Sequence, residues 1–184
     1  MEIKKIFVHF ADGFEEIEGI TPVDVLRRAG CDVTMVSVTG NRMVKSSRNV
    51  VIQTDMLFEE LDYELADMLV LPGGMPGSKN LDMHEGLKNE LLIADRKGKW
   101  IAAICAAPMV LGHMGLLQGR KATCFPGHEK DLIGATSTGK SLEIDENFIT
   151  AKGAGVSLKF SLCLVEMLLG KEKAQEIKTK MMVE

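Results

Sequence analysis

Cys105 is the residue of this sequence that is best placed for chemistry. It stands in the stretch WIAAICAAPMVLGHMG (100–115), where a run of small apolar residues ends and Pro108 fits the first turn of a helix. A thiol between a strand and a helix start meets unpaired backbone N–H groups, which favour the thiolate. This order of elements is typical of a nucleophile elbow, in which a sharp turn lifts the side chain above the sheet. The alternative is that Cys105 is a small buried hydrophobic residue.

The other cysteines and the histidines carry weaker signals. Cys31, Cys124 and Cys163 are better explained as core residues, and Cys163 lies within the apolar run SLCLVEMLL. No CxxC pair occurs, and the four histidines have no metal-type spacing with the cysteines, so we expect no metal site. His128 is the histidine most able to approach the site, because it follows a predicted strand by a few residues. No histidine is forced into a Cys–His pair, which counts against a cysteine protease.

Two glycines form the second candidate feature. Gly73 and Gly74, in the stretch LPGG, follow an apolar run and could turn the backbone so that its N–H groups face a ligand. Such donors could hold an oxyanion of a carbonyl substrate or of an oxidised sulfur. A tight turn explains the same glycines equally well. The stretch is not a phosphate-binding loop, because the GK[ST] ending is missing.

Acidic residues in ADGFEEIEG (11–19) form the third feature. We expect Asp12 to cap the helix that follows, and Glu15 with Glu16 suits the first turn of that helix. Glu18 lies one turn after Glu15 and could point either into solvent or into the crevice. In the crevice its carboxyl would tend to stay protonated and could donate a hydrogen bond to a thiolate or move a proton. We then expect a pKa for Cys105 well below the ~8.5 of a free thiol.

The elements that must position these residues alternate between strands and helices. We expect strands over 3–10, 31–38, 66–74, 100–105 and 120–125, hairpins over 44–55 and 141–153, and helices over 15–30, 84–98, 107–115, 155–170 and 171–181. Nearly continuous apolar strands between helices predict a mostly parallel sheet covered on both faces, which is a doubly wound α/β sandwich. Ligands bind such sheets at the carboxyl ends of the strands, where all three candidate features lie.

Composition narrows the class of protein. The 184 residues suit a single domain over 1–184, with 46% hydrophobic and 26% charged residues. The net charge of −4 counts against nucleic acid as a partner, and no apolar run approaches the ~20 residues that cross a bilayer. The first ten residues, MEIKKIFVHF, read as a strand rather than a signal peptide, so we expect a cytoplasmic protein with reduced thiols.

Several stretches together resemble one known family. ADGFEEIEGITPVDVLRRAG, SSRNVVI, VLPGGMPG, AAICAAP, CFPG and AKGAGVSLKFSLCLVEMLLGKEKAQEI occur in the order and at the intervals of the ThiJ/PfpI family, which is class I glutamine amidotransferase-like. The likeness is greatest to the branch of the Parkinsonism-associated deglycase and the bacterial YajL protein. It runs nearly from end to end, and the combination of motifs is highly specific.

The resemblance implies a fold and a set of site residues. It implies a flavodoxin-like sandwich, a homodimer, and a reactive Cys105 at a strained elbow with Glu18 as its partner. Gly73, Gly74 and Ala106 would supply backbone donors near the sulfur, with no cofactor. The resemblance further implies a role for Arg48, which would approach the site from the other subunit. From their places in the sequence, we also expect Glu15 and His128 to support the site.

The activities of similar proteins leave two hypotheses of different classes. Relatives are described as cofactor-free glyoxalases, deglycases, redox-dependent chaperones and, in another branch, peptidases. Peptidase-like members have a histidine where this chain has Ala106, which counts against proteolysis, and some members have a histidine where this chain has Phe125, which counts against efficient glyoxalase turnover. The first hypothesis is an enzyme that acts on small aldehydes or glycated substrates through Cys105. The second is a redox-sensing chaperone in which Cys105 is oxidised.

Overall fold

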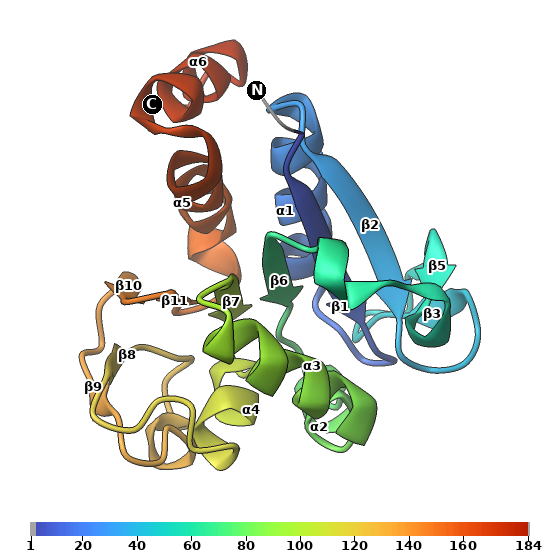
Figure 1. The fold of residues 1–184 in the computed structure, drawn as a ribbon, viewed down its shortest axis with the longest axis vertical. Helices are drawn as coiled ribbons and strands as arrows, with labels where there is room; N and C mark the ends of the chain where they lie inside the picture. Colours follow the sequence, from blue (N-terminus) through green and yellow to red (C-terminus); the bar gives the residue numbers. More distant parts are fainter. Residues whose placement is uncertain (1–2, 184) are drawn as a thin grey trace.

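The central element of the computed structural model, which describes residues 3–183, is a seven-stranded sheet. Its strand order is β10-β11-β7-β6-β1-β2-β5, and every pair of neighbours is parallel except β10 and β11. The strands are β1 (Lys5–Phe10), β2 (Asp32–Ser37), β5 (Met56–Leu57), β6 (Met68–Leu71), β7 (Trp100–Ile104), β10 (Leu142–Asp145) and β11 (Phe148–Ala151). The predicted mostly parallel sheet is confirmed (Figure 1).

Six helices cover the two faces of this sheet (Figure 1). One face packs against α1 (Glu16–Arg28), α5 (Ser157–Leu169) and α6 (Lys171–Lys180), and the other packs against α2 (Gly77–Asp82), α3 (Glu85–Arg96) and α4 (Pro108–His113). Short 3-10 turns lie at Phe58–Glu60, Tyr63–Leu65, Glu129–Asp131 and Ala154–Val156. This arrangement is a flavodoxin-like α/β sandwich, as the sequence predicts.

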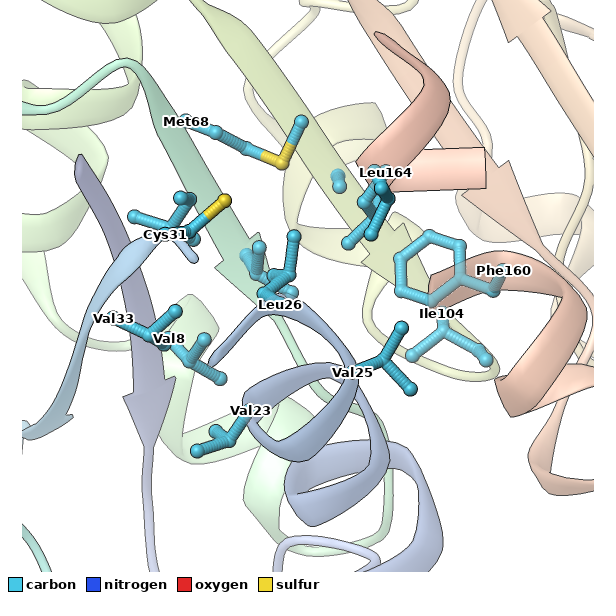
Figure 2. Packing of buried hydrophobic residues seen from close by; sticks show 14 of the residues in the cluster. Val8, Val23, Val25, Leu26, Cys31, Val33, Met68, Ile104, Phe160 and Leu164 are labelled. Atoms are coloured by element: carbon cyan, nitrogen blue, oxygen red, sulfur yellow. The ribbon is translucent and has the colours of Figure 1, made fainter. Parts of the chain in front are cut away.

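Both faces of the central strands are apolar because both faces are covered. All four residues of β6 are buried, and its neighbours are β1 and β7. Alternate residues of one strand enter different cores: Val8 of β1 packs with α1 and α5, whereas Phe7 packs with α2, α3 and α4. Figure 2 shows the first of these cores, where Leu26 of α1 and Leu164 of α5 lie near strand residues.

Three segments differ from the expected elements. Residues 120–125 do not join the central sheet: β8 (Lys121–Ala122) pairs with β9 (Thr136–Ser137) in a separate parallel ribbon. The reason is that β11 occupies the place beside β7, so Thr123 N–H is left to bond the hydroxyl of Thr150 at 3.0 Å. Helix α4 has six residues, fewer than the expected span. Helix α2 is unpredicted because GSKNLD lacks apolar periodicity.

Both predicted hairpins are present. The first consists of β3 (Met43–Lys45) and β4 (Val51–Gln53), which form an antiparallel two-stranded sheet of their own. The second joins β10 to β11 through a turn at Glu146, whose φ is 51°. The first hairpin packs on the start of α1, where Ser47 N–H donates to the carbonyl of Phe14 at 2.7 Å.

The topology directs attention to one end of the sheet. Strand β1 lies between β2 and β6, so the strand order reverses direction there, and the carboxyl ends of β1 and β6 are where such sheets bind their ligands. The loops after β1, β6 and β7 meet at this end, and Figure 1 shows both chain ends at the other end of the molecule. Within residues 3–183 no helix has the length and apolar character needed to span a bilayer.

Candidate active site

Cys105 stands on a sharp turn directly after β7. Its φ is 65°, in the left-handed region, which costs a residue other than glycine roughly 1–3 kcal/mol. Two backbone hydrogen bonds hold it there: its N–H donates to the carbonyl of Ala151 at 2.8 Å, and its carbonyl accepts from Phe125 N–H at 2.8 Å. The thiol is free and half-buried. This is the geometry of the nucleophile elbow that the sequence predicts.

Glu18 is buried in the first turn of α1, with 1% of its surface exposed. The residue that caps α1 is Glu15, whose carboxylate accepts the Glu18 N–H at 2.8 Å. The expectation that Asp12 caps this helix is wrong, because its carboxylate instead accepts the N–H of Lys45 at 2.9 Å. Glu15 therefore caps the helix and, through the same hydrogen bond, helps to hold Glu18 in its buried position.

Gly73 is required by close packing rather than by a turn alone. A Cβ built on Gly73 would lie 2.6 Å from Cys105 Cβ and 2.7 Å from the carbonyl oxygen of Ile104, and it would overlap Glu18 Oε2. The backbone after β6 thus fills the space between the thiol and the carboxyl. Gly74 has a φ of 92°, which other residues adopt rarely. Of the two interpretations that the sequence left open, the structure favours a backbone that approaches the reactive groups.

Four backbone amides lie near the two acidic groups. The amides of Gly74 and Ala106 act to lower the pKa of the Cys105 thiol, and those of Gly73 and Ala154 act to lower the pKa of the Glu18 carboxyl. Glu18 Oε2 is nevertheless buried without a hydrogen-bond partner among the described residues. Gly73 lies close to both groups, since a Cβ on it would meet Glu18 Oε2 and Cys105 Cβ. Ala154 was not predicted, because it acts through its backbone amide, which the type of side chain does not reveal.

The two acids change each other's ionisation. Burial raises the pKa of Glu18 to about 7. Burial, and then the neighbouring Glu18 carboxylate, raises the pKa of the Cys105 thiol to about 12 despite the two amides. The expected low thiol pKa is therefore wrong for a site in which Glu18 is ionised, and α4 is too short to add much dipole. Where Glu18 titrates near neutral pH, the Cys105 thiol therefore keeps its proton.

Arg48 and His128 lie away from the sulfur within this chain. Arg48 is exposed between β3 and β4, where its N–H donates to the carboxylate of Glu16 at 3.0 Å. The imidazole of His128 faces Asp131, with its Nδ1 3.2 Å from Oδ2. Among residues 3–183 neither side chain has a hydrogen bond to Cys105 or Glu18. Of the predicted side chains, the structure brings together Cys105, Glu18 and Glu15.

A chain of histidine and aspartate side chains lies beside the site and was not predicted. Asp82 of α2 bonds His113 of α4 at 2.9 Å, and Asp131 lies 3.5 Å from the other nitrogen of His113 and also contacts His128. The carboxylates raise the pKa of His113. These residues come from three separated segments of the chain, so no sequence motif predicts that they lie together. In the described part of the chain, no group of His, Cys, Asp and Glu side chains could hold a metal ion.

Phe125 is the other residue at the site that the sequence placed by likeness alone. Its backbone is tied to Cys105, and 49% of its surface is exposed. A Cβ built on Gly153 would lie 3.3 Å from Phe125 Cδ2 and 3.9 Å from Glu18 Oε1. The ring and the carboxyl therefore lie on the same side of the Gly153 backbone.

Known proteins resemble this chain over most of its length. Protein DJ-1 homolog B of Arabidopsis thaliana is 39% identical over 95% of this chain, and Protein dj-1beta of Drosophila melanogaster is 38% identical over 98%. The chain covers 40% of the first protein and 97% of the second. It likewise covers 45% of DJ-1 homolog A of Arabidopsis, so it spans less than half of both plant relatives. A protein of Pyrococcus abyssi named a deglycase is 29% identical over 82% of this chain and 91% of its own.

Solved structures show the same fold. Drosophila melanogaster DJ-1beta superimposes with a TM-score of 0.94 at 36% identity, with all of both chains covered. An oxidized DJ-1 of Toxoplasma gondii superimposes with a TM-score of 0.92 at 34% identity, covering 97% of this chain and 98% of that one. The family model described as DJ-1/PfpI matches residues 4–167. With these likenesses beside the elbow cysteine and its buried glutamate, the chain belongs to the DJ-1/PfpI family.

Proposed function

We propose that the protein converts small 2-oxoaldehydes, free or as adducts with amines or thiols, to 2-hydroxy acids through Cys105 and without a cofactor. The observation that carries this proposal is the close approach of the Cys105 thiol and the buried Glu18 carboxyl, with the backbone amides of Gly74 and Ala106 near the sulfur and those of Gly73 and Ala154 near the carboxyl. An acid with a pKa of about 7 beside a thiol can both accept and return a proton at neutral pH. The Pyrococcus relative that is named a deglycase belongs to the same class of chemistry.

The first step is addition of the thiol to the aldehyde. The sulfur forms a bond to the aldehyde carbon, the C=O π pair moves to the oxygen, and the thiol proton passes through Glu18 to that oxygen. The amides of Gly74 and Ala106 lie beside the sulfur, within reach of an oxygen on the carbon bonded to it. The product is a hemithioacetal.

The second step is an internal oxidation and reduction. The Glu18 carboxylate removes the proton from the hemithioacetal carbon and returns it to the neighbouring ketone carbon, while the hydroxyl proton of the hemithioacetal passes to the ketone oxygen. The first carbon is thereby oxidised to a thioester while the second is reduced to an alcohol, so no external oxidant is needed. Water then cleaves the thioester, which releases the 2-hydroxy acid and restores the thiol. From an amine or thiol adduct of the aldehyde, the free amine or thiol leaves as the Cys105 adduct forms.

The test is lactate formation from methylglyoxal by the purified protein and two cysteine variants. Cys105→Ala should lose the activity, whereas Cys163→Ala should keep it, because Cys163 is an equally half-buried thiol on α5, outside the crevice. Glu18→Gln should lose most of the rate, since no carboxylate remains to move the protons. Equal rates in the unaltered protein and Cys105→Ala would overturn the proposal.

A second candidate is a redox sensor with chaperone function. Its support is that the amides of Gly74 and Ala106 would also hold the oxygens of a sulfinate on Cys105. Mild peroxide followed by mass spectrometry should then oxidise Cys105 faster than Cys31, Cys124 or Cys163. Equal rates of oxidation at all four thiols would eliminate the sensor.

The proposed working form is a homodimer. An exposed apolar surface runs from α1 to the hairpin of β3 and β4, with Ile17, Ile20, Val50 and Val51 between 38% and 53% exposed. Pairing of this surface between two copies would bury it. Arg48 lies in the same hairpin, so it could reach the site of the partner.

A further inference from the structure

We propose that Phe125 makes the Cys105 site selective for aldehydes that carry an aromatic or bulky apolar substituent. Among the 2-oxoaldehydes of the proposed function, those with an aryl or bulky alkyl substituent, and their adducts, are then preferred to methylglyoxal. This selectivity rests on the proposed function for its substrate. The contact with the Phe125 ring should affect the reaction of Cys105 with any electrophile, whether or not that electrophile is turned over.

The backbone fixes Phe125 next to the reactive sulfur. Its N–H donates to the carbonyl of Cys105 at 2.8 Å, and Cys105 itself is held by Ala151. The backbone of Phe125 is therefore hydrogen-bonded directly to the elbow residue. A shift of this residue would also disturb the turn that presents the thiol.

The Phe125 ring and the Glu18 carboxyl share the Cβ position of Gly153 as a neighbour. The Cβ position of Gly153 lies 3.3 Å from Phe125 Cδ2 and 3.9 Å from Glu18 Oε1. The φ of Gly153 is 161°, which is extended backbone that any residue adopts, so its conformation does not require glycine. The missing side chain leaves space next to the ring and the carboxyl. A larger residue at position 153 would press against both.

The ring has an open apolar face. Phe125 is 49% exposed, whereas Phe10, Phe14, Phe148 and Phe160 are almost fully buried. Met75, which follows the sulfur donor Gly74, is also 47% exposed. A substituent on a carbon bonded to Cys105 can cover such a ring, and offset or edge contacts between aromatic rings add to the burial of apolar area.

Alkylation of Cys105 measures this contact without turnover. The probes are iodoacetamide and N-benzyl iodoacetamide, and mass spectrometry gives the rate at each cysteine. The benzyl-to-plain ratio at Cys105 is divided by the ratio for free glutathione, which removes the intrinsic reactivity of the probes. We expect this normalised ratio to exceed one in the unaltered protein. We expect it to fall about tenfold in Phe125→Ala and by less in Phe125→Leu, which keeps an apolar side chain.

The control is Leu65→Ala. Leu65 is 54% exposed and lines a hollow with Trp100, at the opposite end of β7 from Cys105. The ratio should not change in this variant. An unchanged ratio in Phe125→Ala would overturn the proposal, and so would an equal fall in Leu65→Ala.

Turnover provides the second measurement. The ratio of kcat/KM for phenylglyoxal to that for methylglyoxal should fall about tenfold in Phe125→Ala. If the protein turns over neither aldehyde, the proposed function is wrong, and the alkylation ratio still decides the role of Phe125. If both aldehydes are turned over and neither ratio depends on Phe125, the function stands and the selectivity is wrong.

Discussion

The carboxyl of Glu18 lies against the thiol of Cys105, and its Oε2 occupies the space that a side chain on Gly73 would need. These two residues come from the start of α1 and the end of β7, which are separated by nearly half of the sequence. Their contact depends on one residue without a side chain. The reactivity of the thiol is therefore a property of the pair and of the backbone between them.

Alkylation of Cys105 should follow the ionisation of this pair. The rate with iodoacetamide should rise through about pH 7, where the first proton leaves, because the pKa of Glu18 is raised to about 7. Glu18→Gln removes the group that accepts the thiol proton, while burial of the sulfur persists. The rise through pH 7 should then disappear and the rate at pH 7 should fall about tenfold, whereas the alkaline rise of the rate should move to lower pH, because the carboxylate that raises the thiol pKa is gone. Cys163, whose pKa burial raises to about 11, is the internal reference. An unchanged rise through pH 7 in Glu18→Gln would contradict the coupling.

Gly73→Ala should disable the site and destabilise the fold. The new Cβ would press on Cys105, Ile104 and Glu18, and overpacking of this kind costs about 1–3 kcal/mol. Urea unfolding measures that loss, and alkylation of Cys105 should slow by at least tenfold. Gly155→Ala is the matched control, because a Cβ there meets no atom within 4 Å. Comparable losses in both variants would show that the packing around Gly73 is not the cause.

Glu18 should lower stability at neutral pH. Its pKa is about 7 in the folded protein and about 4.5 when unfolded, so the folded state binds more protons between these values and stability falls as pH rises. Glu18→Gln should be more stable than the unaltered protein at pH 8, by up to about 3 kcal/mol, with the difference shrinking as pH falls from 7 and nearly gone at pH 4.5. Glu16→Gln should behave oppositely, because its hydrogen bond with Ser46 helps lower the pKa of Glu16. Denaturant unfolding from pH 4 to 8 measures both differences. Loss of stability in Glu18→Gln at pH 8 would refute this account.

His9 should limit stability on the acidic side. It is fully buried on β1, where Nδ1–H donates to the carbonyl of Val70 at 3.2 Å and Nε2 accepts from the Tyr63 hydroxyl at 2.9 Å. Burial lowers the pKa of His9 from 6.5 to about 4, so the unfolded chain binds the extra proton first. This group alone should remove about 3 kcal/mol of stability as pH falls from 6.5 to 4. His9→Asn lacks the titration, and the slope of stability against pH should flatten whatever the packing costs. An equal slope in both proteins would exclude His9 as the cause.

The proposed dimer should depend on the apolar surface of α1. Ile17 is 53% exposed, and Ile17→Glu would place a charge in the paired surface. Sedimentation velocity should then show a monomer, whereas Met83→Glu, at a site that is 60% exposed on the other side of the sheet, should remain dimeric. If Arg48 serves the partner's site, the monomer should also react more slowly at Cys105. A monomeric unaltered protein at micromolar concentration would exclude the dimer.

Much of the fold could be predicted because its signals are local. The continuous apolar run of β6 and the strand–helix alternation require a parallel sheet with two covered faces, and the structure has one. The elbow at Cys105 was also predictable, since a strand end, a thiol and Pro108 stand within nine residues. The likeness to one family then selected Glu18 from several acidic residues.

The remaining features depend on contacts between distant segments. The amide of Ala154 and the ring of Phe125 reach the site through β11 and the loop after β8, so no spacing in the sequence reveals them. Asp12 was expected to cap α1, but the hairpin of β3 and β4 supplies it with the N–H of Lys45. The direction of the thiol pKa was missed because burial outweighs the donors, and burial is a property of the folded molecule.

The groups around the sulfur come from the loops after β1, β6, β7 and β11, and each of these loops follows a different strand of the sheet. No fragment of the chain holds them together. During refolding, Cys105 should therefore become protected from fast alkylation only when the last of these connections forms, because the folded site raises the pKa of its thiol to about 12, and a brief pulse of reagent would count the molecules that are not yet native. The alkylation rate of Cys105 therefore reports whether the whole sheet has been assembled.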